Sequence, residues 1–124
     1  MTGIEPVGHA SADAVEQLIP LTEEELLARL GALALGESLG FGPADFGRYV
    51  RIGRRWLESQ ASTLRDLLCL SPTVLAARQM TAGDDAVLAA AIADVLLGSY
   101  DLPTAATAAL LLTRRGLNTL CSNG

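Results

Sequence analysis

The sequence predicts a single all-α domain, a compact bundle of five or six helices with one long central helix. Three observations support this prediction. Apolar residues recur at steps of three and four along most of the chain, Leu and Ala supply most of the hydrophobic residues, and no alternating segment is bounded by hairpin turns. With 124 residues, half of them hydrophobic, the chain is long enough to form one core.

The first segment predicts a tail and a short helix. Residues 1–10 contain glycine and proline without periodicity, so we expect a flexible N-terminal tail before a helical bundle domain that spans residues 11–121. Ser11 is expected to cap a helix that runs through Ile19. Pro20 should end this helix, because proline cannot continue it.

The next two helices have the clearest periodicity. Thr22 and Glu25 form a capping box for a helix that should end near Gly36. One helix of about seven turns is expected over residues 44–68, and Gly53 on its apolar side should let a neighbouring helix approach closely. The other residues on this apolar side are Phe46, Tyr49, Val50, Trp56, Leu57, Gln60, Leu64, Leu67 and Leu68.

Three shorter helices are expected over residues 72–80, 84–98 and 103–120. Ser71 should cap the first of them, and Pro103 suits the first turn of the last one. The middle helix is apolar nearly all round, which predicts that it is buried on most sides.

Within that apolar helix, Asp94 interrupts the hydrophobic pattern. We expect Asp94 to mark the one exposed stripe of the helix. The alternative is a buried carboxylate that pairs with Arg114 or Arg115, since a buried charge needs a partner. The surplus of apolar residues in the last two helices predicts either an exposed patch suited to association or a monomeric bundle with an ordinary core.

No catalytic, metal or cofactor site is predicted. The single histidine, His9, lies in the expected tail, and the chain has no lysine for Schiff-base or P-loop chemistry. Cys69 and Cys121 lie too far apart for a zinc motif, and we expect two buried, inert thiols rather than a disulfide framework. The protein is therefore not expected to be an enzyme or to bind a cofactor.

The chain also lacks the features of export or membrane insertion. Its start contains Glu5 and Asp13 where a signal peptide would have basic and then apolar residues. The most apolar span, residues 86–112, is interrupted by Asp94 and Pro103, so it is too short to cross a bilayer. We therefore expect a soluble protein in the cytoplasm.

Charge is unevenly distributed along a chain with a net charge of −5. Residues 1–45 contain one arginine and eight acids, whereas residues 46–80 contain six arginines and two acids. The basic helix either selects an acidic protein partner, packs beside the acidic helix within the fold, or exposes a solvated polar face. The clustered arginines are Arg48, Arg51, Arg54 and Arg55.

Four short segments form two sequence signatures, the first two segments making one and the last two the other. They are residues 53–57 (GRRWL), 64–69 (LRDLLC), 92–96 (IADVL) and 114–121 (RRGLNTLC). Over residues 46–121 the chain resembles small helical proteins that bacteria encode beside signalling or defence effectors such as proteases and nucleotide-dependent ATPases. The resemblance implies an accessory or adaptor role and assigns no functional residue.

These features predict a non-catalytic protein–protein interaction module, an adaptor or accessory subunit of a bacterial effector system. Its partner would be another protein, a second copy in a homodimer included, and neither nucleic acid nor membrane is expected. One alternative is a helix-turn-helix DNA-binding regulator that uses residues 71–80, where Arg78 is the only basic residue. The other is a membrane-associated helical protein that uses residues 86–112. The predicted partner-binding residues are Arg48, Arg51, Arg54 and Arg55.

Overall fold

The computed structural model describes residues 9–36, 43–80 and 84–122, which form seven helices and no strand. The predicted all-α class is confirmed. There is one helix more than the highest number expected, because Gly116 divides the last predicted helix in two. The helices are α1 (His9–Leu18), α2 (Glu23–Ala34), α3 (Pro43–Leu68), α4 (Pro72–Met80), α5 (Asp85–Leu96), α6 (Leu102–Arg115) and α7 (Leu117–Cys121).

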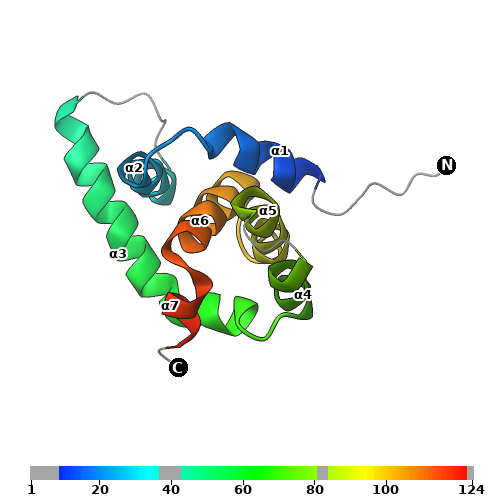
Figure 1. Cartoon of the computed structure of the whole chain (residues 1–124). Helices are drawn as coiled ribbons and strands as arrows, with labels where there is room; N and C mark the ends of the chain where they lie inside the picture. The colour runs from blue at the N-terminus through cyan, green and yellow to red at the C-terminus, as the bar shows by residue number, and fades with distance from the viewer. Residues whose placement is uncertain (1–8, 37–42, 81–83, 123–124) are drawn as a thin grey trace.

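The centre of the molecule is occupied by α6, against which α1, α2, α5 and α7 pack (Figure 1). Every residue from 105 to 113 is buried. The hydroxyls of Thr107 and Thr113 donate to carbonyls one turn back in the same helix, at 2.7 and 2.8 Å, so burial leaves neither hydroxyl unsatisfied. The longest helix, α3, lies at the edge of the molecule instead of its centre (Figure 1).

The helices α2 and α3 are in backbone contact. A Cβ atom added at Gly53 would overlap the carbonyl oxygen of Leu27, and one added at Gly31 would overlap that of Tyr49. The predicted close approach at Gly53 is therefore confirmed, and it is reciprocal because each helix contributes a glycine. The predicted capping box of α2 is also present. The Thr22 hydroxyl accepts from the backbone amide of Glu25, and the Glu25 carboxylate accepts from the backbone amide of Thr22.

The start of α1 differs from the prediction. The helix begins at His9, two residues before the expected position, and the rest of the expected tail lies outside the described residues. Ser11 does not cap α1. It lies within the helix, is fully buried, and donates its hydroxyl proton to Asp94 Oδ1 at 2.7 Å.

Local polar residues start the later helices. The Ser71 hydroxyl accepts from Val74 N, as predicted for α4, and the Asp84 carboxylate accepts from Val87 N at the start of α5. Asp101 caps α6 in the same way, and its hydrogen bonds with Thr104 lower the pKa of its carboxyl. None of the described helices is long and apolar enough to cross a membrane.

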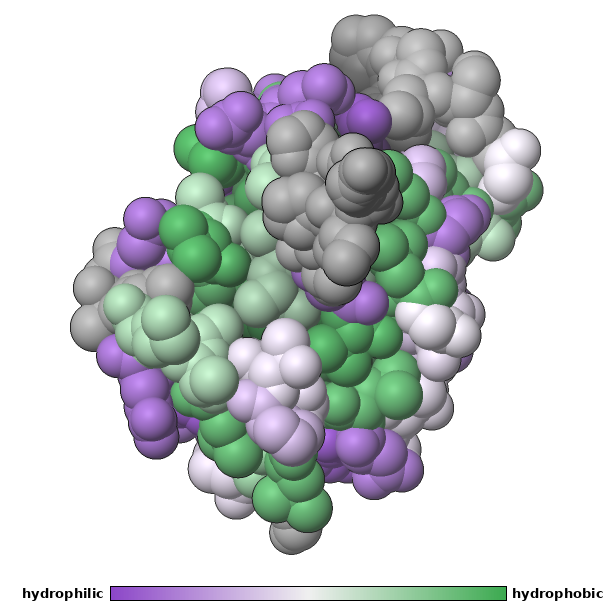
Figure 2. Space-filling view, turned by 90° about the vertical axis from the view of Figure 1, so that its right-hand side faces the viewer, coloured by the Kyte–Doolittle hydropathy of each residue, from purple (hydrophilic) through white to green (hydrophobic). Residues whose placement is uncertain are grey.

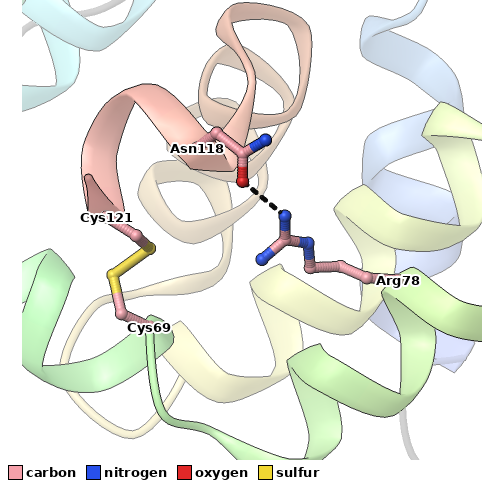
Figure 3. The surroundings of a disulfide bond; sticks show 4 residues. All are labelled: Cys69, Arg78, Asn118 and Cys121. Atoms are coloured by element: carbon pink, nitrogen blue, oxygen red, sulfur yellow. Dashed lines mark hydrogen bonds between the residues drawn. A yellow bond between two sulfur atoms is a disulfide. The ribbon is translucent and has the colours of Figure 1, made fainter.

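The C-terminal helix α7 is fastened to the rest of the fold. Gly116 has a φ of 91°, which turns the chain so that Cys121 reaches Cys69 at the end of α3. The two cysteines form a disulfide, with their Cα atoms 5.6 Å apart (Figure 3). The expectation of two buried thiols is therefore wrong. The cysteines are 52 positions apart in the sequence, so local sequence does not show that the ends of α3 and α7 meet.

Candidate functional site

The predicted partner-binding arginines lie on the exposed side of α3. Arg48, Arg51, Arg54 and Arg55 are all exposed. Three of them, without Arg54, border a small hollow of about 110 Å³ beside Ile52. The guanidinium of Arg48 also lies 5.0 Å from the ring centroid of Tyr49, which is a cation–π distance.

These arginines do not neutralise the acidic start of α2 in the described part of the chain. Glu23 of α2 instead pairs with Arg115 at the end of α6, at an N–O distance of 2.9 Å. Among the described residues, no carboxylate lies within ion-pair distance of Arg51, Arg54 or Arg55. Charge pairing within the described ranges therefore does not account for these three arginines.

The opposite side of α3 is anchored to the connection between α5 and α6. The rings of Trp56 and Tyr100 meet edge to face, with centroids 5.4 Å apart, and the Tyr100 hydroxyl donates to Gln60 Oε1 at 2.7 Å. Burial raises the pKa of the Tyr100 phenol. Together with the glycine contact to α2, this anchor fixes which side of α3 faces solvent.

A second surface, which we name the α1/α4/α5 groove, was not predicted as such. It has a volume of about 740 Å³. Its lining is mostly alanine, and hydrophobic residues gather on this side of the molecule, with hydrophilic ones along the border (Figure 2). The residues that line it are Ala12, Glu16, Thr73, Ala76, Ala77, Met80, Ala86, Val87, Ala90, Ala91 and Asp94.

The groove shows that α5 is only partly covered by other helices. Ala89, Ile92 and Leu96 are buried as expected, but Val87 is 46% exposed. An all-apolar helix does not reveal in its sequence which stripe faces the core. The nearest indication was Asp94, because a carboxylate seldom faces a core.

Asp94 lies half-buried in the groove, where its carboxylate accepts the Ser11 hydrogen bond. The predicted alternative of a pair with Arg114 or Arg115 is wrong. Arg114 donates to the carbonyls of Ile19 and Leu21, beyond the end of α1, and Arg115 pairs with Glu23. No cation among the described residues lies within ion-pair distance of Asp94.

Arg78, the remaining basic candidate, is held within the fold. Arg78 of α4 donates to Asn118 Oδ1 of α7 at 2.7 Å, close to the disulfide (Figure 3). His9 belongs to the first turn of α1. In the described ranges, no three residues of the types His, Cys, Asp and Glu gather as metal ligands would.

Two surfaces of different character thus lie on different sides of the molecule. The arginines are on α3 at one edge, and the groove lies between α1, α4 and α5 at the other (Figure 1). Neither protein-family models nor curated proteins match the sequence, and no solved structure matches the fold.

Proposed function

We propose that this protein is a non-catalytic protein–protein interaction module, an adaptor or accessory subunit of a bacterial effector system. The main support is the exposed position of Arg51, Arg54 and Arg55, which lack a carboxylate partner among the described residues. A guanidinium presents planar donors that match a carboxylate, so these residues suit an acidic patch on another protein.

The way α3 is held supports the same proposal. Gly53 lies against the backbone of α2, and Trp56 lies against Tyr100, so the helix is fastened on its inner side. A fixed helix presents its arginines at a constant spacing, which lowers the ordering cost of binding. We expect these charges to set partner choice and encounter rate more than affinity.

The proposal includes a cytoplasmic location. The redox state of Cys69 and Cys121 then depends on whether that compartment is reducing. Disulfides persist in oxidising compartments and are rare where thiols are kept reduced. In a reducing cytoplasm the pair would be two thiols, and α7 would then be held by the buried Leu117 and by the bond from Arg78 to Asn118. Thiol titration of protein isolated under acid-quenched conditions distinguishes the two states.

The proposal is tested by affinity capture from the source cells after nuclease treatment. The native protein is compared with a variant in which Arg51, Arg54 and Arg55 are replaced by Glu. We expect at least one acidic protein whose capture falls roughly tenfold in the variant and also falls as salt is raised, because exposed charge pairs are screened.

A control for added negative charge on the same helix is Ser62→Glu with Thr63→Glu, both at exposed positions. This control should capture the partner as the native protein does. Equal capture by the native protein and the arginine variant would overturn the arginine surface as the binding site. Capture of nucleic acid instead, in samples without nuclease, would favour the DNA-binding alternative.

A further inference from the structure

We infer that the α1/α4/α5 groove binds an amphipathic helix of another protein that has arginine or lysine beside its apolar face. This surface is separate from the arginines of α3, so the inference does not depend on the function proposed above. It follows from the shape of the groove, from its apolar lining and from its charge.

The shape of the groove suits a fourth helix packed against α1, α4 and α5. Each of α1, α4 and α5 contributes residues spaced three or four apart, which form one stripe along each helix. Most of these residues are alanines, such as Ala12, Ala76 and Ala90, and small side chains at a contact allow short distances between helix axes. A volume of about 740 Å³ leaves room for a row of side chains from the bound helix.

Large apolar side chains remain exposed beside the alanine lining. Met80 at the end of α4 is 83% exposed, and Val87 at the start of α5 is 46% exposed. Both residues line the groove, and hydrophobic surface is visible on this side of the molecule (Figure 2). Contiguous exposed apolar surface usually marks an interaction site, and methionine adapts its shape to different partners.

The charge of the groove specifies the partner further. Glu16 and Asp94 are the charged residues among its lining, and both are acidic. Arg78, the basic residue of α4, is held by Asn118 of α7 and is not part of the lining. The buried Ser11 hydroxyl orients the Asp94 carboxylate at the edge of an apolar wall, where attraction to a cation is stronger than in bulk water. A basic side chain on the bound helix would complement both carboxylates.

The acidic charge and the apolar lining of the groove argue against two other occupants. A fatty acid or an anionic lipid would place its own negative group beside Glu16 and Asp94, which would repel it. A second copy of the chain could offer its basic helix α3, but the apolar side of α3 is already buried against α2. That helix would bring arginines without the apolar face that the groove requires.

The test uses a fluorescein-labelled peptide of about 18 residues, designed as an Ala/Leu helix with arginines beside its apolar face. Its twin has glutamates in place of the arginines. Fluorescence anisotropy should show that the basic peptide binds the full chain at least roughly tenfold more tightly than the acidic twin at low salt. The double variant Glu16→Gln with Asp94→Asn should weaken the basic peptide about fivefold. Asparagine keeps an oxygen that can accept from Ser11, so this variant should fold.

The matched control is Glu24→Gln with Asp66→Asn, which removes the same charge from exposed positions outside the groove. It should leave the affinity of the basic peptide nearly unchanged. Alanine-methyl NMR then locates the peptide. Methyl signals of Ala12, Ala76 and Ala90 should shift, while those of the buried Ala105 and Ala109 of α6 should not.

Three results would overturn the inference. The first is equal affinity for the basic peptide and its acidic twin. The second is that the groove methyl signals shift with protein concentration alone, which would identify a second copy as the occupant. The third is that oleate shifts these signals while the basic peptide does not, which would identify a lipid site.

Discussion

Two glycines set the distance between α2 and α3. Gly31 and Gly53 each face a backbone carbonyl of the other helix, at a separation that no Cβ atom could occupy. This contact lies at the inner side of α3, and it therefore helps to determine how the arginines on the outer side are presented. The role of Gly53 is steric, because neither glycine has a positive φ.

Replacement of Gly53 by Ala should destabilise the protein by roughly 2 kcal/mol or more. Overpacking against a backbone carbonyl cannot be relieved by side-chain rotation, and its cost exceeds the gain in helix propensity of about 1 kcal/mol. The matched control is Gly47→Ala on the same helix, where the added Cβ would meet only the flexible end of Arg51, 3.7 Å away. That variant should be stabilised by up to about 1 kcal/mol.

Urea unfolding followed by the fluorescence of Trp56, the only tryptophan of the chain, measures both variants. Trp56 lies against Tyr100, so its emission should change when α3 separates from the core. If both glycine variants were stabilised alike, the backbone contact between α2 and α3 would be wrong.

At the scale of elements, α7 is the helix that depends most on a covalent bond. It has five residues, too few for an isolated helix to be stable. Among these five, only Leu117 is buried. The disulfide from Cys121 to Cys69 and the hydrogen bond from Arg78 to Asn118 hold it against α3 and α4 (Figure 3).

Removal of this disulfide should lower the free energy of unfolding by about 2 to 4 kcal/mol. The closed loop of 52 residues restricts the unfolded chain, and the chain-entropy estimate for such a loop is about 4 kcal/mol. The test compares native protein with the double variant Cys69→Ala and Cys121→Ala, each with and without reductant. Reductant should destabilise the native protein to a similar extent and leave the double variant unchanged. Native protein that contains two titratable thiols and ignores reductant would contradict the disulfide.

The elements that could be predicted from the sequence are those with local determinants. The capping residues Thr22 and Ser71 lie within three residues of the amides that they accept from, so short sequence windows reveal them. The close approach at Gly53 was visible because an amphipathic stripe showed which side of α3 is apolar. These local patterns were sufficient to predict the all-α class and most helix boundaries.

The features that were missed depend on contacts between distant parts of the chain. The bond from Ser11 to Asp94 joins residues 83 apart, and it removes Ser11 from the capping role that its local sequence suggested. The groove could not be predicted from the sequence for a related reason. The stripe of α5 that lines it and the stripe that faces the core are both apolar, and only the packing of α1 and α4 distinguishes them.

At the scale of the whole molecule, the acidic chain separates two candidate surfaces of opposite charge. The arginines of α3 lie at one edge and the α1/α4/α5 groove at the other, with the buried helix α6 between them (Figure 1). An adaptor that uses both surfaces could hold two partners at once. This arrangement predicts that the two surfaces bind independently.

Independence can be measured with the basic peptide as the probe. Reversal of Arg51, Arg54 and Arg55 to Glu should leave the peptide affinity within about twofold at physiological salt, because distant sites without shared partners are usually additive. At low salt the same variant should bind the basic peptide more tightly, since the field of the added negative charge then extends across the molecule. This salt dependence separates a long-range field from direct contact. A loss of affinity above roughly fivefold that persists at physiological salt would mean that the arginines and the groove belong to one site, and the two-surface arrangement would have to be abandoned.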